Sequence, residues 1–389
     1  MGTNFYFKII INIMINIFNP IKKLTSTNKS IINAVNKFCR TNLPNYINKN
    51  CHQELYKEFG TLGILGSTLS TSGCLGINYQ TYGLIAKELE YIDSSFRSMV
   101  GVQTSLVMSP ISKYGNDIAK DKYINDLRLG NKIGCFGLTE SESGSDASKM
   151  KTYAVLKNDM YILNGSKTWI TNAPIADIFI IWAKLNNRIN GFIIEKDTLG
   201  LDITEIKNKL SFKSSPTGMI FLNNVKVPIE NKLNVVGMKG PLSVLNEARI
   251  GLSMGALGAA ESCIDISMDY VKNREMFGSY LSEKQLVQNK LVNMIIEYNL
   301  GLSLSMDIIE SYDNGTCDPE LISVIKRNNA YKSLEIARTA RDILGANGIT
   351  EEYNVFRHLN NLETVNTYEG TYDLHTLILG KYFIGSSAF

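Results

Sequence analysis

The sequence predicts an α+β fold in which a helical segment, a β segment and a second helical segment follow one another along the chain. Apolar residues recur with helical spacing up to about residue 130, alternate with a period of two from Ile133 to about Val236, and return to helical spacing after Pro241. The 389 residues are enough for two or three packed units. Neither an internal repeat nor a low-complexity linker separates the segments, so we expect them to pack closely.

Composition and charge exclude several classes of protein. The 44% of hydrophobic and 20% of charged residues are ordinary for a globular protein and argue against a disordered chain. Forty Lys and Arg residues against 37 Asp and Glu residues give a net charge of +3, which does not indicate nucleic-acid binding. Six cysteines without a Cys-x-x-Cys spacing and only three histidines argue against a disulfide scaffold and against a metal site.

Residues 1–20 are expected to form an N-terminal extension. Its apolar run, Phe5–Phe18, is interrupted by three polar residues and is shorter than the about 20 residues of a membrane span, so we expect no such span. The first acidic residue is Glu54, and a basic, acid-free start fits a transit peptide to an organelle. Transit peptides favour Arg and Ser, whereas this segment favours Asn and Ile, so a composition bias of the whole genome is the alternative.

The first helical segment is expected over residues 21–132, where Tyr82, Ile85, Leu89 and Ile92 share one helical face.

Arg97 is a candidate binding residue in this segment. Glu90 and Asp93 precede it by seven and four residues on one helical face. One interpretation is an ordinary ion pair between Asp93 and Arg97, which stabilises a helix by a few tenths of a kcal/mol. The other is a guanidinium that Glu90 orients and that binds a carboxylate with two hydrogen bonds.

The β segment is expected over residues 133–238. Short strand-like runs begin at Tyr153, Met160, Ile178 and Gly191. The pairs Asn158-Asp159 and Asn186-Asn187 are typical of tight turns between such strands.

Two stretches of the β segment are candidate cofactor sites. The loop CFGLTESESGSD (Cys135–Asp146) offers hydroxyls and amides at Thr139, Gly144 and Ser145 that can hold a pyrophosphate or the polar edge of a flavin, although a plain turn is the alternative. In NGSKTWITNA (Asn164–Ala173), Trp169 can cover an aromatic ring system and Thr171 can hydrogen-bond a ring nitrogen. A core tryptophan at a strand end explains this second stretch equally well.

The second helical segment is expected over residues 239–389, with long helices in Gln285–Ile308 and Pro319–Leu344. Arg274 and Phe277 in the motif REMFG, together with Gln285, can bind a diphosphate and stack on an adenine. A surface arginine near a helix end is the alternative. The motif DILGANG permits close approach of the backbone to a ligand or a simple helix end.

Glu369 in the motif TYEGT is the candidate general base. It stands in a polar, uncharged stretch, where burial can raise the pKa of a carboxyl group toward neutrality. The alternative is a charge at the start of a helix.

These motifs, in this order and over an α–β–α chain, resemble those of the acyl-CoA dehydrogenase family. The resemblance covers roughly Pro20–Phe389. The segments SFRSMVGVQTSLVM (Ser95–Met108) and NLETVNTYEGTYDLHTLILG (Asn361–Gly380) are most similar to the glutaryl-CoA dehydrogenase branch of that family.

The resemblance implies an N-terminal helical domain, a middle β-barrel domain and a C-terminal four-helix bundle. It implies a homotetrameric FAD flavoprotein that converts glutaryl-CoA to crotonyl-CoA and CO2 in lysine and tryptophan breakdown and passes electrons to an electron-transfer flavoprotein. The compartment would be the mitochondrial matrix in a eukaryote and the cytoplasm in a bacterium. The alternatives are a short-chain acyl-CoA dehydrogenase without decarboxylation, an inactive relative kept as a scaffold, and an acyl-CoA oxidase.

The resemblance also implies roles for individual residues, with Glu369 as the base that removes the α-proton. The implied FAD contacts are Phe136, Leu138, Thr139, Gly144, Ser145, Trp169, Ile170, Thr171, Phe277, Thr371 and Phe389, with Arg274, Gln285, Asp342, Gly345 and Ala346 reaching the FAD of a neighbouring subunit. The implied substrate contacts are Glu90, Arg97, Ser98, Ser145, Leu242, Asn246, Arg249, Tyr368 and Gly370. Among them Arg97 would bind the distal carboxylate of the substrate, Gly370 the thioester, and Arg249 would close the CoA channel.

Three positions depart from the family pattern. Ser141 stands where proline is usual, which loosens the loop but removes no donor. Ala346 replaces a glycine and adds a methyl group near the cofactor. Gly101 replaces a serine that is frequent in this branch, which bears on how tightly the distal carboxylate is held.

Overall fold

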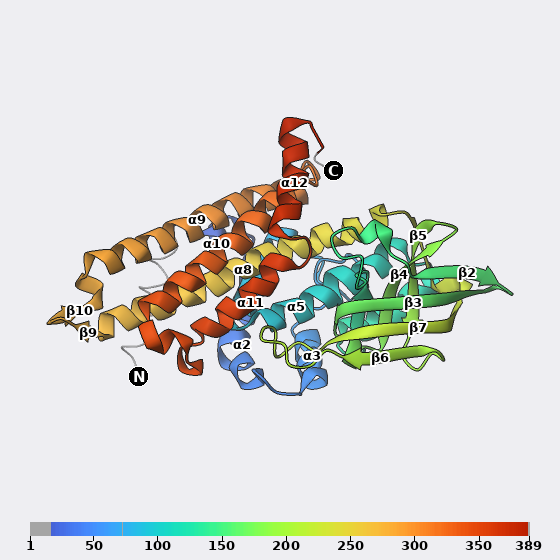
Figure 1. The fold of residues 1–389 in the computed structure, drawn as a ribbon, viewed down its shortest axis with the longest axis horizontal. Helices are drawn as coiled ribbons and strands as arrows, with labels where there is room; N and C mark the ends of the chain where they lie inside the picture. Colours follow the sequence, from blue (N-terminus) through green and yellow to red (C-terminus); the bar gives the residue numbers. More distant parts are fainter. Residues whose placement is uncertain (1–16, 72, 388–389) are drawn as a thin grey trace. The chain divides into compact units, whose positions relative to one another are not determined.

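The computed structural model describes residues 17–71 and 73–387 (Figure 1). The expected N-terminal extension as far as residue 16, and the cofactor contact predicted for Phe389, lie outside the described residues. Among the helices that the structure describes, none combines the length and the hydrophobicity that a membrane crossing requires.

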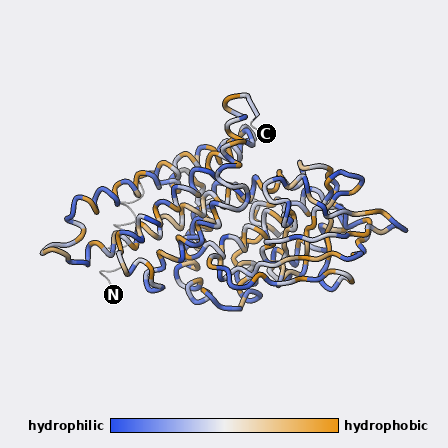
Figure 2. Tube along the Cα trace, viewed as in Figure 1, coloured by the Kyte–Doolittle hydropathy of each residue, from blue (hydrophilic) through white to orange (hydrophobic). Residues whose placement is uncertain are grey.

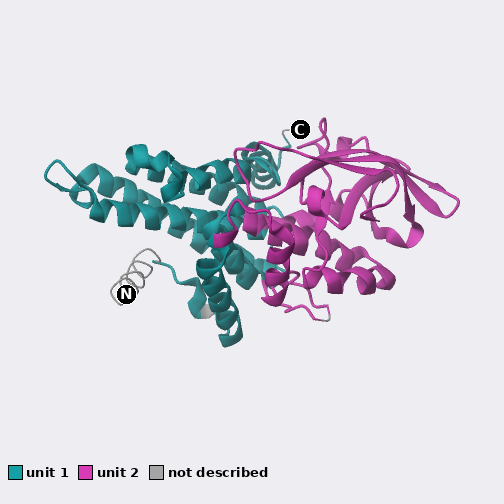
Figure 3. Ribbon diagram, turned by 90° about the horizontal axis from the view of Figure 1, so that it is seen from below, with its two compact units in different colours: residues 1–44, 79–94, 250–389 teal, residues 45–78, 95–249 magenta. Residues whose placement is uncertain are grey.

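Packing divides the chain into two units, shown in Figure 3. Unit 1 consists of residues 1–44, 79–94 and 250–389, and unit 2 of residues 45–78 and 95–249. The sequence expectation was three consecutive domains, and that division stays a prediction. Each packing unit combines stretches that lie far apart in the sequence.

Unit 1 is helical. Its elements are α2 (Ser26–Thr41), α4 (Tyr79–Ile92), the part of α8 (Lys239–Asn273) from residue 250, the short strands β9 (Glu275–Met276) and β10 (Ser279–Tyr280), α9 (Gln285–Asp313), α10 (Leu321–Ile343), α11 (Val355–Thr367) and α12 (Tyr372–Ile384). Helices α8, α9, α10 and α11 form the predicted four-helix bundle (Figure 1). Asn329 on α10 joins three of them, since its Nδ2 donates to the carbonyl oxygen of Ser253 at 3.2 Å and to Oγ of Ser305 at 2.7 Å.

Helix α4 is buried on nearly every side, although the sequence pattern indicated a single apolar face. The predicted face is buried, and so are Lys87, Glu88 and Glu90. Lys87 is paired with Glu261 of α8 and lies 3.4 Å from Glu88, which accepts a hydrogen bond from Arg40 at 3.0 Å. These ion pairs offset the cost of burying the charges, and a pattern that counts only apolar residues misses them.

Unit 2 combines helices with a mixed sheet. Its helices are α3 (His52–Thr61), α5 (Ser94–Gly101), the π-helix η3 (Val102–Met108), α6 (Ser109–Tyr114) and α7 (Asp117–Arg128). Its strands are β1 (Gly134–Gly137), β2 (Tyr153–Lys157), β3 (Met160–Thr171), β4 (Ile178–Leu185), β5 (Arg188–Glu195), β6 (Leu201–Glu205), β7 (Thr217–Pro228) and β8 (Lys232–Val236). The observed β region therefore begins and ends within two residues of the predicted one.

The strands pair in the order β6-β7-β3-β2-β4-β5-β8, and β1 pairs with β4. Side chains from β1 to β7 pack into one interior cluster, as in a barrel, while β6 and β8 are the edges of the pairing. Strand β4 is buried on both faces, because Phe179 and Ile181 belong to this cluster and Ile180 and Trp182 to a second one with the helices. Burial on both faces explains why the strand has an almost continuous apolar sequence.

Both predicted turns are confirmed. Asn158, Asp159, Asn186 and Asn187 have φ between 49° and 61°, and they connect the antiparallel pairs β2–β3 and β4–β5. Two successive residues with positive φ are what a tight two-residue hairpin requires. Figure 2 shows hydrophobic and hydrophilic positions interleaved along the strands and the bundle helices, which is the pattern used to predict them.

Candidate active site

The predicted site residues are divided between the two units. The proposed base, Glu369, and the motifs around Arg274 and Asp342 belong to unit 1, whereas the loop of residues 135–146, Trp169 and Arg97 belong to unit 2.

Glu369 lies in the short turn between α11 and α12. It has φ of 55° and Gly370 has φ of 100°, so both residues are left-handed. Thr371 ends the turn by capping α12, since its hydroxyl accepts a hydrogen bond from the amide of Leu374 at 3.1 Å. Glu369 Oε2 is shielded from solvent. A left-handed glutamate costs of the order of 1–3 kcal/mol, and such strain clusters at functional sites.

Arg274, Phe277 and Gln285 gather at one end of the bundle. Arg274 follows α8, Phe277 and Gly278 form the left-handed turn of the β9–β10 hairpin, and Gln285 begins α9. The side chain of Phe277 is 92% exposed, although its backbone has φ of 54°. An exposed aromatic ring can stack on an adenine, and this role of Phe277 stays a prediction.

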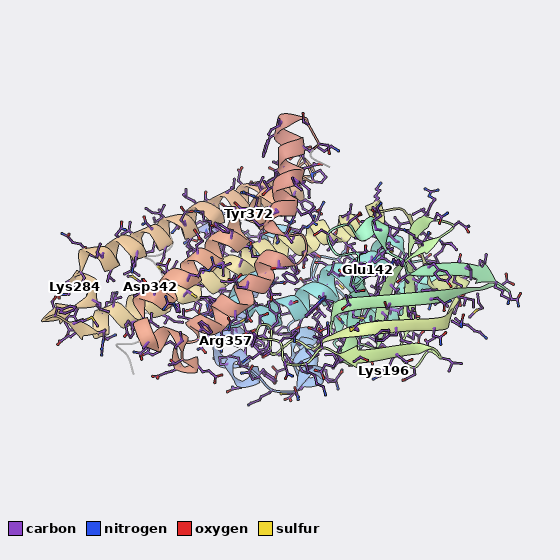
Figure 4. All side chains as sticks on the ribbon, viewed as in Figure 1. Glu142, Lys196, Lys284, Asp342, Arg357 and Tyr372 are labelled. Carbon is purple, nitrogen blue, oxygen red and sulfur yellow. The ribbon has the colours of Figure 1, made fainter. Side chains whose placement is uncertain are left out.

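The DILGANG motif lies at the same end. Asp342 near the end of α10 accepts a hydrogen bond at 2.5 Å from Lys290 of α9, and this contact holds the pKa of its carboxyl group below the ordinary value. Gly345 has φ of 59° with open space around it, and Ala346 is exposed, so the extra methyl group lies at the surface of this end of the bundle. Figure 4 shows Lys284 and Asp342 toward the hairpin end of the bundle and Tyr372 toward the other.

The predicted cofactor loop of unit 2 is fixed by a buried ion pair. Lys167 Nζ donates to Oε1 of Glu140 at 2.8 Å and to the carbonyl oxygen of Leu138 at 3.0 Å. Glu140 also accepts hydrogen bonds from the backbone amides of Lys151 at 2.6 Å and Thr152 at 3.0 Å. Burial lowers the pKa of Lys167 to about 8, although the hydrogen bond that it donates to Glu140 opposes this shift.

The tip of this loop contains the polar groups that the sequence singled out. Gly144 and Ser145 are exposed, and a side chain at Gly144 would meet nothing within 4 Å. Ser143 is different, because its hydroxyl donates to the carbonyl oxygen of Asp146 at 2.6 Å and so shapes the loop. Thr139 is half-buried, and its carbonyl oxygen accepts from the amide of Thr168 on β3.

Trp169 is turned outward by a β-bulge. The register of β3 against β7 shifts between Lys167 and Ile170, and Trp169 there has φ of 59°. Its side chain is 62% exposed, while Thr168 and Ile170 on either side are buried. Bulges often re-aim a side chain next to a ligand site. The alternative of a core tryptophan at a strand end is therefore wrong, and Thr171 follows at the half-buried end of the strand.

The residues predicted to contact the substrate in unit 2 lie on two helices. Arg97 and Ser98 on α5 are 3% and 1% exposed, and the π-helix η3 follows directly. On α8, Arg249 is buried and its Nη1 donates to Oδ1 of Asn246 at 2.9 Å, whereas Leu242 is exposed. Phe136 packs edge-on against Trp182 at 6.2 Å between ring centroids.

Glu90 and Asp93, which the sequence places on one helical face with Arg97, belong to unit 1, and their proximity to Arg97 stays a prediction. Glu90 is fully buried on α4. Within unit 1, the carboxylate of Asp93 is held by Arg357 at 2.9 Å and by Nδ2 of Asn361 at 3.1 Å. Asp93 is thus engaged by α11, which the spacing of the helical residues did not indicate.

Two fully buried lysines, Lys167 and Lys326, were not among the predicted site residues. Each donates to backbone carbonyls next to a predicted site, Lys167 at Leu138 and Lys326 at Gly370. A signal existed for Lys326, because Ile322, Ile325, Lys326 and Asn329 occupy one helical face that is buried.

The donors present fit a flavin cofactor. In unit 2 the exposed ring of Trp169 and the open backbone at Gly144 are suited to an aromatic ring system with a polar edge. In unit 1 the exposed Arg274 and Phe277 are suited to a diphosphate and an adenine.

Three sequence models of one protein family match successive stretches of this chain. These are the N-terminal domain of acyl-CoA dehydrogenase over residues 25–131, the middle domain over 135–225 and the C-terminal domain over 236–383. An acyl-CoA dehydrogenase of Bacillus subtilis is 32% identical, with 86% of this chain and 90% of that protein covered. A short-chain-specific acyl-CoA dehydrogenase of Megasphaera elsdenii is 32% identical, with 84% and 89% covered.

Solved structures agree with the sequence relatives. The crystal structure of glutaryl-CoA dehydrogenase from Mycobacterium smegmatis has a TM-score of 0.94 at 41% identity, covering 97% of this chain and 98% of that one. A crystal structure of a glutaryl-CoA dehydrogenase from the same organism in complex with FADH2 has a TM-score of 0.91 at 42% identity, with 94% and 96% covered.

Proposed function

The chain belongs to the acyl-CoA dehydrogenase family and takes FAD as its cofactor, and on this premise we propose that it oxidises and decarboxylates glutaryl-CoA to crotonyl-CoA and CO2. The observation that carries the proposal is the buried guanidinium of Arg97, which is 3% exposed and is followed by the buried hydroxyl of Ser98. A buried cation suits a substrate with a second carboxylate and is costly beside an alkyl chain. The likeness to the two Mycobacterium smegmatis enzymes supports the same substrate.

In this proposal Glu369 is the base. The α-proton of a thioester is weakly acidic, and a carboxylate shielded from bulk water and held rigidly can remove it. FAD, when bound, supplies the acceptor for the hydride that leaves the β-carbon. The residues proposed to hold it are Trp169, Thr171 and the loop with Thr139 and Ser145.

Decarboxylation follows from the position of the second carboxylate. After the oxidation this carboxylate stands one carbon beyond the new double bond, so the electrons of the breaking C–C bond can move into the thioester as CO2 leaves. Glu369, protonated by the first step, is the proposed acid that returns a proton to the resulting anion. Arg97 would hold the carboxylate until that bond breaks.

The family also suggests partners, which we propose here for this chain. Val292, Ile296, Leu300 and Leu304 form an exposed apolar stripe along α9, and such a stripe supports assembly into a homotetramer. An electron-transfer flavoprotein is the proposed electron acceptor.

A short-chain acyl-CoA dehydrogenase without decarboxylation is the second candidate, and the likeness to the Megasphaera elsdenii protein favours it. The two candidates differ in what Arg97 should do. If Arg97 binds no carboxylate, its replacement by an apolar residue should not change the ratio of kcat/KM for glutaryl-CoA to that for butyryl-CoA, whereas the first candidate predicts a selective loss for glutaryl-CoA.

The experiment is anaerobic mixing of the FAD-loaded protein with glutaryl-CoA and with butyryl-CoA, followed by flavin bleaching and trapped CO2. Arg97→Met should lower kcat/KM for glutaryl-CoA. The loss should correspond to about 2–5 kcal/mol in activation free energy, which is the cost of truncating one partner of a buried charge pair. Butyryl-CoA should lose little. Equal losses for both substrates would make Arg97 structural, and glutaconyl-CoA without CO2 would identify an enzyme that does not decarboxylate.

A further inference from the structure

A buried lysine holds the turn that carries Glu369. Lys326 on α10 is fully buried, and its Nζ donates to the carbonyl oxygen of Gly370 at 2.5 Å and to that of Asn366 at 3.3 Å. Asn366 belongs to the last turn of α11, and Gly370 follows Glu369. One ammonium group therefore joins the end of α11 to the far side of the left-handed turn.

Lys326 lies on a helix face where an apolar residue is expected. It occupies the core face of α10 with Ile322, Ile325 and Ala330, where an apolar side chain would pack without losing solvation. An ammonium group on such a face is stable only when it is well hydrogen-bonded. The carbonyl oxygens of the turn provide those bonds, so the lysine and the turn stabilise one another.

A second buried side chain holds the same turn from α12. His375 is fully buried, and its Nε2 lies 3.3 Å from the carbonyl oxygen of Glu369, to which it donates when that nitrogen carries the proton. The Glu369–Gly370 peptide is planar and trans, so fixing its carbonyl oxygen also fixes the direction of the Gly370 amide. A side chain at Gly370 would approach Nε2 of His375 to 2.7 Å, which leaves room for glycine only.

The two anchors act on adjacent peptide groups. His375 holds the carbonyl before Gly370, and Lys326 holds the carbonyl after it. Glu369 itself, with φ of 55°, would relax toward negative φ without them, because a glutamate disfavours the left-handed region. Such a rotation would carry its carboxylate away from its present position.

We infer that Lys326 is a positioning residue for catalysis, because its two hydrogen bonds keep the Glu369–Gly370 turn left-handed and so aim the carboxylate of the base. His375 supports the turn from the other side. The inference rests on the proposed function in one respect, which is that Glu369 is the base.

The test compares Lys326→Met with Lys332→Met on the same helix. Methionine removes the ammonium group but keeps a side chain of similar length. Lys332 is the control, because it is a half-buried lysine that pairs with Glu297 at 3.3 Å. The FAD-loaded wild type and both variants are assayed with whichever of glutaryl-CoA and butyryl-CoA the wild type oxidises. Lys326→Met should lose up to roughly 10²-fold in kcat, the cost of a small misplacement of a reacting group, with KM and FAD content nearly unchanged. Lys332→Met should match the wild type.

An isotope effect separates positioning from a general loss of structure. With substrate deuterated at the α-carbon, the effect on kcat should increase in Lys326→Met, because proton removal becomes the slow step. Partial unfolding would reduce the amount of active enzyme and leave the isotope effect as it is. A kcat close to that of the wild type, or a lower kcat with an unchanged isotope effect, would overturn the inference.

Two further measurements keep the result decisive. If Lys326→Met does not fold with FAD bound, Lys326→Gln replaces it. Its amide can donate to only one of the two carbonyls, so a smaller loss of kcat with a larger isotope effect is expected, and wild-type values of both would overturn the inference. A crystal structure of the variant should show Glu369 outside the left-handed region, and an unchanged turn would contradict the inference whatever the activity. A wild type that oxidises butyryl-CoA but not glutaryl-CoA would contradict the proposed substrate alone.

Discussion

Trp169, Phe277 and Glu369 share a backbone conformation that residues other than glycine rarely adopt. Their φ angles are 59°, 54° and 55°. Such angles persist only where neighbouring structure imposes them. At Trp169 that structure is a β-bulge, at Phe277 a hairpin turn, and at Glu369 the buried side chains of Lys326 and His375.

The motifs located all three of these residues but did not indicate their conformation. The residue types are compatible with a core tryptophan, a surface aromatic and a helix-capping glutamate. The left-handed angle of Glu369 follows from contacts of its turn with His375 and Lys326, which lie 6 and 44 positions from the residues they hold, and that of Trp169 follows from the pairing of β3 with the distant strand β7. Local sequence does not encode contacts of that range.

Glu369→Gln tests the role of the base itself. The amide is close in shape to the carboxylate, so FAD and acyl-CoA binding should persist, but it cannot accept the α-proton. We expect dehydrogenation to fall by about 10²–10⁴-fold, the usual contribution of a general base. The measurement is the rate of flavin bleaching under anaerobic conditions, with ligand binding followed by the shift of the flavin spectrum as the control. A variant that retains more than about a tenth of wild-type turnover would show that another group removes the proton.

At the scale of elements, β3 and the loop before β2 form a clamp. The ammonium group of Lys167 on β3 donates hydrogen bonds to the carbonyl oxygen of Leu138 and to the carboxylate of Glu140. The same carboxylate accepts hydrogen bonds from the backbone amides of Lys151 and Thr152. The strands and their turns were predictable because alternation and Asn-rich turns are local signals. The clamp was not predictable from the sequence, because Lys167 is about 30 residues from Leu138 and Glu140. A lysine in a strand is also normally expected to be exposed.

Lys167→Met should loosen the loop and weaken FAD binding. It leaves the carboxylate of Glu140, which is 7% exposed, without its cation, and removing one partner of a buried pair costs roughly 3–5 kcal/mol. The matched control is Lys151→Met, because Lys151 pairs with Glu142 at the exposed surface of the same loop. The measurement is the dissociation constant of FAD by fluorescence.

The pH dependence of FAD binding gives a second check on the clamp. Burial lowers the pKa of Lys167 to about 8, so at pH 9 most of this lysine is neutral and its attraction to Glu140 is lost. Wild-type FAD affinity should therefore fall between pH 7 and pH 9 toward that of Lys167→Met, while the variant stays constant. A loss of the same size in both proteins would assign the effect to another group.

At the scale of the whole molecule, the order of the segments was predictable and their packing into units was not. The change from helical to strand periodicity near Ile133 and back after Val236 is visible in the sequence, and the structure confirms it. The assembly of residues 79–94 with residues 250–389 is a long-range event. It depends on contacts such as the pairing of Lys87 with Glu261, for which the sequence has no periodic signal.

The bundle separates two groups of predicted site residues. Lys326, which contacts the Glu369–Gly370 turn, and Asp342 lie 16 residues apart on α10, or about 24 Å at 1.5 Å per residue. The β9–β10 hairpin, which follows Arg274 and has Phe277 in its turn, lies at the Asp342 end of the bundle (Figures 1 and 4). This separation supports the proposal that the second group contacts the cofactor of a neighbouring subunit rather than the one beside Glu369.

Arg274→Ala tests that proposal, because a residue that reaches a neighbour's cofactor links FAD binding to assembly. Removing a charge-assisted hydrogen bond of roughly 1.5–3 kcal/mol should lower FAD affinity by about tenfold to a hundredfold. The oligomer should also dissociate at a higher protein concentration than the wild type, and added FAD should restore it. The measurements are flavin content after dilution and size-exclusion chromatography over a concentration series, with Arg188→Ala as the control, since Arg188 is an exposed arginine at the start of β5 in unit 2. A contact across the subunit boundary predicts that FAD content and oligomer size decrease together. Reduced FAD content at an unchanged oligomer size would therefore place the contact of Arg274 within one subunit.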